Sequence, residues 1–133
     1  MEFKNNEAIY LQIADYISER ILMEKWGADE KIPSVREMAG TLEVNPNTVM
    51  RSYEQLQQAE IIYNKRGLGF FVSKAAIKNI KKLQQAKFMG YELPQFFKTI
   101  SLLNISLEEI TEKYKSYLDE NIHSKIEKDE NKQ

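Results

Sequence analysis

The feature that most constrains this chain is a pair of helix-start signals set close together between residues 33 and 47. Ser34 and Glu37 have the spacing of a capping box, in which each side chain bonds the other residue's amide. Asn45 and Pro46 form the second start, an N-cap followed by proline at the first helical position. This order predicts a short helix, a tight turn and a second helix. Such a helix-turn-helix unit fits its second helix into the DNA major groove.

The residues after the second helix predict a β-hairpin. That helix is expected to run from Pro46 to about Ala59, and β-prone residues follow at 61–63 and 70–72. A basic turn with two glycines joins these runs, as in a hairpin whose tip projects from the domain. Ile32, upstream, is expected to close over the core or to form a very short edge strand. The sequence therefore predicts a wing behind the helix-turn-helix.

Further helices are expected on both sides of this unit. An apolar stripe predicts a half-buried helix over about Glu7–Lys25, capped by Asn5 or Asn6. The tail helices are expected over about Ala75–Met89 with Gly90 as the stop, over Leu93–Leu103, and from a capping box at Ser106 and Glu109.

Together these elements predict a mainly α protein with a small β-hairpin, a winged helix-turn-helix followed by a short helical dimerisation tail. Residues 1–74 are expected to form the DNA-binding domain and residues 75–120 the helical dimerisation region. Residues 121–133 are mostly charged and polar, so a disordered tail is expected there.

Composition argues against several classes of function. The chain has no cysteine and a single histidine, His123, so neither a disulfide nor a histidine-based metal site or catalytic triad is expected. No phosphate-binding or dinucleotide fingerprint is present, and no enzyme activity, cofactor or metal is predicted. The first residues do not have the form of a secretory signal, and no apolar run is long enough for a membrane span. The chain is expected to be cytoplasmic, without a membrane partner.

The charge distribution favours a nucleic-acid partner more than the net charge of −1 does. Residues 61–91 contain no acidic side chain, and a local basic patch can hold DNA on an otherwise acidic chain. A solvated helix face is the competing interpretation for the lysines from 78 to 87. The basic side chains of this segment are Lys65, Arg66, Lys74, Lys78, Lys81, Lys82 and Lys87.

A helical projection separates the core face of the second helix from its outer face. Val49, Tyr53 and Leu56 fall on one narrow arc and are expected to be buried, whereas Asn47 and Arg51 point the opposite way. Thr48 lies beside that outer face. Recognition helices read bases from their N-terminal half, and arginine and asparagine pair bidentately with guanine and adenine. Asn47, Thr48 and Arg51 are therefore predicted to contact bases.

The first helix and the wing are predicted to contact the DNA backbone. Arg36, with the Ser34 and Val35 amides, is a candidate phosphate clamp, and a surface ion pair with a glutamate is the alternative. Lys65 and Arg66 supply charge at the wing tip, where glycines let the backbone approach DNA. The predicted DNA-binding set is Ser34, Val35, Arg36, Asn45, Asn47, Thr48, Arg51, Lys65, Arg66, Gly67 and Gly69.

Residues 8–73 resemble the N-terminal domain of the GntR family of bacterial winged-helix transcription regulators. The matching segments read IYLQIADYI, KIPSVREMA, VNPNTVMRSYEQL and KRGLGFFV, and the short tail and VNPNTV are similar to the YtrA-type subgroup. The resemblance implies a homodimer on a two-fold-related DNA operator, often as a repressor, with Arg36 on DNA and Gly67 as the wing glycine. Better-known members carry arginines where this chain has Pro46 and Met50, so their base preference does not transfer.

The tail exposes more apolar surface than so small a body can cover, which indicates an interface. A two-fold dimer would place two recognition helices about 34 Å apart. A small-molecule effector between tail helices, near an aromatic cluster around Gly90, is a hypothesis without a named ligand. Folding back of the tail, a winged helix that binds proteins instead of DNA, and architectural DNA binding stay open as alternatives. The predicted dimerisation residues are Phe88, Phe96, Phe97, Ile100, Leu103, Ile110, Tyr114 and Leu118.

Overall fold

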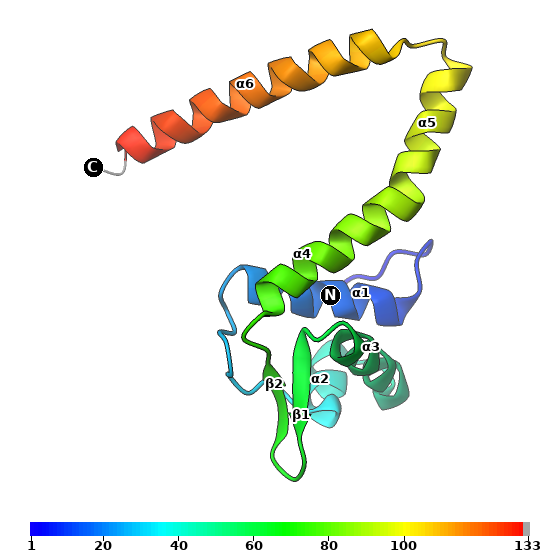
Figure 1. The fold of residues 1–133 in the computed structure, drawn as a ribbon. Helices are drawn as coiled ribbons and strands as arrows, with labels where there is room; N and C mark the ends of the chain where they lie inside the picture. The colour runs from blue at the N-terminus through cyan, green and yellow to red at the C-terminus, as the bar shows by residue number, and fades with distance from the viewer. Residues whose placement is uncertain (132–133) are drawn as a thin grey trace. The chain divides into compact units, whose positions relative to one another are not determined.

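The computed structural model describes the backbone of residues 1–131 and the side chains of residues 1–122, so His123 lies outside the described side chains. The elements in chain order are α1 Ile9–Leu22, α2 Val35–Leu42, α3 Pro46–Gln58, β1 Ile62–Lys65, β2 Gly69–Val72, α4 Ala76–Lys87, the π-helical turn η1 Phe88–Glu92, α5 Leu93–Leu102 and α6 Leu107–Asn131 (Figure 1). The chain divides into two compact units, a head over Met1–Lys87 and a tail from Phe88 onward.

The core of the head is built by α1, α2, α3 and the hairpin. Val49, Tyr53 and Leu56 of α3 are fully buried, as the helical projection predicts. The Tyr53 hydroxyl donates a hydrogen bond to the Pro33 carbonyl oxygen at 2.6 Å, and its ring meets Phe70 edge-on at 5.0 Å between centroids. These contacts fix α3 against the link before α2 and against the wing.

Local hydrogen bonds set both starts of the helix-turn-helix as predicted. The Glu37 amide donates to Ser34 Oγ, and the Ser34 amide donates to Glu37 Oε1, both at 3.1 Å. Asn45 Oδ1 accepts from the Asn47 amide at 2.8 Å, with Pro46 in the first turn. The turn between α2 and α3 is closed by Glu43, whose backbone is left-handed at a φ of 56°.

The start of α1 differs from the prediction that Asn5 or Asn6 caps it. The helix begins after Ala8, whose side chain provides no cap. Gln12 fastens this end instead, because its Oε1 accepts from the Lys4 amide at 2.7 Å and its Nε2 donates to backbone carbonyls of the same segment. Gln12 therefore anchors the segment that precedes the helix, whereas the first turn of α1 has no side-chain cap.

The hairpin pairs β1 with β2 in antiparallel register, from Ile62 opposite Val72 to Lys65 opposite Gly69 (Figure 1). A turn bond from the Leu68 amide to the Lys65 carbonyl, 2.9 Å long, closes the tip. The segment before α2 adds a short edge, since Lys31 forms a bridge with Phe71 and the Ile32 amide donates to the Phe70 carbonyl. A single bridge at Lys31 thus stands where a very short edge strand was the alternative, and Ile32 closes over the core, as expected.

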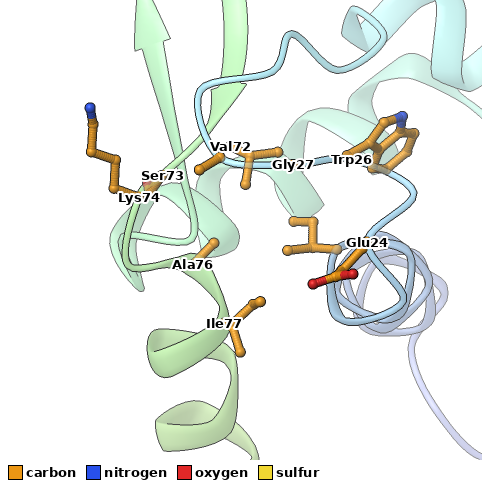
Figure 2. A pocket seen from close by; sticks show the side chains of 10 residues that line it. Glu24, Trp26, Gly27, Val72, Ser73, Lys74, Ala76 and Ile77 are labelled. Atoms are coloured by element: carbon orange, nitrogen blue, oxygen red, sulfur yellow. The ribbon is translucent and has the colours of Figure 1, made fainter.

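Helix α4 packs on the head, beyond the domain boundary expected at residue 74. Ala76 and Ile80 are buried in the head core, and the Asn79 side-chain amide donates to the Glu60 carbonyl at 2.9 Å. A hollow of about 290 Å³ lies where the loop after α1, the end of β2 and the start of α4 meet. Trp26 of the loop and Ile77 of α4 are among the side chains that line it (Figure 2).

Contrary to the prediction, Gly90 does not end the helix that begins with α4, because the chain continues as the π-helical turn η1. It lies in η1, and its φ is not among the positive values that a left-handed helix cap requires. Pro94 explains the wider turn, because proline lacks an amide hydrogen and its ring would clash with the carbonyl four residues back, which is that of Gly90. A π-type turn relieves such a clash by adding a residue to the turn.

The remaining tail is helical. Ser106 Oγ accepts from the Glu109 amide at 3.1 Å, which sets the start of α6 at the predicted place. The helix then continues to Asn131, through the segment from Asn121 for which the sequence predicts disorder. None of the described helices is long and apolar enough to cross a lipid bilayer.

Candidate nucleic-acid interface

The outer face of α3 carries the side chains predicted to read bases. Asn47 and Arg51 are exposed and Thr48 is half-buried, on the side opposite the buried Tyr53. Asn45, also predicted to contact DNA, uses its Oδ1 as the helix cap. Its side chain can still offer the amide nitrogen as a donor and the second lone pair of Oδ1 as an acceptor.

Arg51 is held by an aromatic ring that the sequence did not indicate. Its guanidinium carbon lies 4.0 Å from the ring centroid of Tyr10, at the start of α1. The neighbouring Ser52 Oγ donates to the Tyr10 carbonyl at 2.6 Å, so backbone and ring of one residue both meet α3. Such a stack limits the rotamers of a long side chain on a helix surface. Tyr10 lies off the apolar stripe of α1, and no local pattern marks it.

The N-terminus of α2 presents Arg36 to solvent. Within the part of the chain that the structure describes, Arg36 makes no ion pair, so the predicted alternative of a glutamate partner is not observed. The Ser34 amide, which was expected to assist a phosphate contact, donates to Glu37 Oε1 in this structure. Bonds from the Ser34 amide and then its hydroxyl lower the pKa of the Glu37 carboxyl.

The lowered pKa of Glu37 predicts that the contribution of this cap to the stability of the fold depends on pH. Because the folded pKa lies below the unfolded value, the stabilisation is complete above the unfolded pKa and is lost as pH falls through the folded pKa. We expect Glu37→Gln to be less stable than the unsubstituted chain near about pH 7, and the difference to shrink near about pH 3. Urea unfolding followed by circular dichroism measures both values. Glu54→Gln, on the exposed face of α3, is the control, and an equal difference at both pH values contradicts the assignment.

The wing tip combines cations with two glycines in the left-handed half of φ space. Gly67, at a φ of 80°, has open space where a side chain would stand. Gly69, at 118°, would place a Cβ 3.0 Å from Lys31 Cε. Lys65 Nζ lies 5.0 Å from the Phe71 ring centroid, whereas Arg66 is simply exposed. The tip thus offers an arginine beside backbone that a phosphate can approach.

Two lysines of the predicted basic segment are paired with carboxylates. Lys74 Nζ lies 3.0 Å from Asp29 Oδ2. This contact has the largest effect on the Asp29 carboxyl, whose pKa it lowers. Lys87 Nζ lies 3.1 Å from Glu7 Oε1 and 3.8 Å from Asp15 Oδ2. The charges of Lys74 and Lys87 are therefore partly neutralised. The other basic residues of the segment are Lys65, Arg66, Lys78, Lys81 and Lys82.

Known proteins share this arrangement. Residues 9–72 match the model of the family described as bacterial regulatory proteins, gntR family. A crystal structure from Bacteroides thetaiotaomicron, described as a transcriptional regulator of the GntR family, is 46% identical with a TM-score of 0.73, over 86% of this chain and 99% of that one. The chain belongs to the gntR family of bacterial regulatory proteins. Its winged helix-turn-helix is the DNA-binding domain of a transcriptional regulator.

Two regulators of the helix-turn-helix type also match, and the longer of the two matches extends into the tail. The regulator YhcF of Bacillus subtilis is 35% identical over 116 residues, which cover 87% of this chain and 94% of the relative. The repressor YtrA of the same organism is 37% identical over 73 residues, 55% of this chain and 56% of that protein. These relatives are transcription regulators, not enzymes. Among the described residues of this gntR member, no group of acidic or histidine side chains is arranged to hold a metal ion.

Proposed function

We propose that this chain is a sequence-specific repressor that binds a two-fold-related operator as a homodimer in the bacterial cytoplasm. The observation that carries the proposal is the exposure of Arg36 on α2 and Arg51 on α3, the two helices of the helix-turn-helix. Both cations face solvent where this unit meets DNA backbone and bases. The partial match to the repressor YtrA supports the YtrA-type subgroup and the repressor role.

In this proposal α3 lies in the major groove and the wing lies against the minor groove or the backbone. Asn47, Thr48 and Arg51 contact base edges from the N-terminal half of α3. Arg36 and the Val35 amide bind a phosphate at the start of α2. The Glu37 carboxylate lies at the same helix end, where it accepts from the Ser34 amide. The wing contributes Arg66 and Lys65 as cations, and Gly67 and Gly69 as the backbone of the tip.

The tail is proposed to form the dimer. Neither η1 nor α5 has a buried residue in the single chain, although both carry aromatic side chains. Phe97 is 51% exposed and Tyr114 is 60% exposed, a state that costs free energy unless a partner covers them. The proposed dimerisation residues are those predicted from the sequence, of which Ile100 and Ile110 are half-buried in the single chain. The structure adds further exposed apolar residues near them. These additions are Leu102, Leu107, Tyr117 and Ile122.

Selection of bound duplexes from a random DNA library tests the proposal. We expect an enriched inverted repeat for the unsubstituted chain, with half-sites about one helical turn apart. Arg36→Ala should weaken binding to the selected repeat by roughly 10-fold, because one phosphate contact is lost, and should flatten the salt dependence. Lys113→Ala removes an exposed cation of α6 and is the matched control.

Other outcomes separate the competing functions. An enriched site without two-fold symmetry would contradict the dimer but leave sequence-specific binding intact. Steeply salt-dependent binding without an enriched sequence would indicate an architectural protein. No binding at all would favour a winged helix that docks on proteins.

A further inference from the structure

A groove on the head lies between α1 and α4, with one wall closed by α3. Its volume is about 430 Å³, within the range of small-molecule sites. It is larger than the hollow of Figure 2, about 290 Å³, whose lysine is already paired with Asp29. The apolar part of the groove is lined by Leu11, Ala14, Ile80, Leu83 and Ala86.

An unpaired acceptor lies in the wall of this groove. Gln55 of α3 lines it, and its Oε1 is buried without a hydrogen-bond donor among the described residues. A buried acceptor left unpaired destabilises the folded state, and a donor supplied by a ligand removes that penalty. Because Oε1 is closed off from the groove in this structure, a ligand donor can pair with it only after the Gln55 side chain turns toward the groove.

The charge at the groove favours a cation. Asp15 lines it, and desolvation by burial raises the pKa of its carboxyl, an effect that Lys87 opposes. The carboxylates of Glu7 and Glu19 also act on Asp15 and raise the pKa further. Lys87 also lines the groove, and its Nζ lies 3.1 Å from Glu7 Oε1 and 3.8 Å from Asp15 Oδ2, so two carboxylates share one ammonium. An additional positive charge would be stabilised here.

We propose that this groove is a binding site for a small amphipathic amine. The apolar body of the ligand packs between Leu83 and Leu11, and its ammonium lies at Asp15. Once the Gln55 side chain turns toward the groove, its Oε1 accepts a hydrogen bond from the ligand. The site differs from the aromatic cluster around Gly90, whose Phe88 and Tyr91 are exposed in the single chain. Since Gln55 belongs to α3, the ligand touches the helix proposed to read DNA, but its binding does not depend on that proposal.

Calorimetry and thermal unfolding of the full chain test the site. The probe is 2-phenylethylamine, and 2-phenylethanol and phenylacetate are its uncharged and anionic counterparts. We expect saturable binding and a raised melting temperature with the amine, and weaker or no binding with the counterparts. Asp15→Asn should weaken amine binding about tenfold, the loss expected for one charge-assisted contact, while the exposed Asp119→Asn of α6 should leave it unchanged.

Ala86→Trp fills the groove and should abolish binding. If that variant does not fold, Asp15→Asn and Gln55→Leu still locate the site, because each should weaken binding of the amine. Failure of all three probes to bind, equal binding of the amine and the alcohol, or amine binding that none of these substitutions weakens would each overturn the proposal. None of these outcomes depends on DNA, so they leave the proposed repressor function untouched.

Discussion

Replacing Tyr53 with alanine should lower the free energy of unfolding by about 3–5 kcal/mol, the range for truncating a buried aromatic side chain. The ring is fully buried and packs edge-on against Phe70 of the wing. Its hydroxyl donates to the Pro33 carbonyl, and burial raises the pKa of Tyr53 well above its ordinary value, so the donor keeps its proton. One side chain therefore holds α3, the wing and the link before α2. Urea unfolding followed by circular dichroism measures the loss.

Two further variants test the explanation for Tyr53. Tyr53→Phe keeps the ring but removes the donor to Pro33, and should cost only about 1 kcal/mol. Tyr63→Ala removes a tyrosine from the outside of the wing, which stacks on Phe71 and bonds Asp29, and should cost less than the alanine substitution at the core. If Tyr53→Ala were no more costly than Tyr63→Ala, α3 would be held mainly by its other buried residues.

The parts of the fold that local chemistry determines could be predicted from the sequence. The capping box at Ser34 joins residues three apart, and the cap at Asn45 joins residues two apart, so the sequence pattern contains both partners. The buried arc of α3 follows from helix periodicity in the same way. The positive φ at Gly67 follows from the turn that joins two short strands.

Features that depend on distant residues, or on competition between two local signals, could not be predicted. The contact of Ser52 with the Tyr10 carbonyl spans 42 residues, and it accompanies the ring that receives Arg51. Gly90 was expected to end a helix because glycine often does, whereas Pro94 imposes a wider turn that keeps the chain helical. Gln12 anchors the segment before α1 through bonds to the Lys4 backbone that no spacing rule describes.

Arg51→Ala should weaken binding to the selected operator roughly 10- to 100-fold and relax base preference at one position of each half-site, because a bidentate base contact is lost. The stack of Arg51 on Tyr10 adds a second expectation. Tyr10→Leu keeps apolar bulk but removes the ring, so the guanidinium loses its support. We expect a smaller loss, about 2- to 5-fold, at the same base position, since an exposed cation–π contact contributes about 0.5–1 kcal/mol. Competition binding with half-site variants measures both effects.

Tyr10→Phe is the matched control for the stack, because it keeps the ring under Arg51 and should bind the operator as the unsubstituted chain does. If Tyr10→Leu instead tightened binding, the ring would hold Arg51 away from the bases, and the stack would act against recognition. If Arg51→Ala left the preference unchanged, Asn47 and Thr48 would carry the base reading from the first turn of α3. In that second case recognition would depend more on phosphate contacts such as that proposed for Arg36.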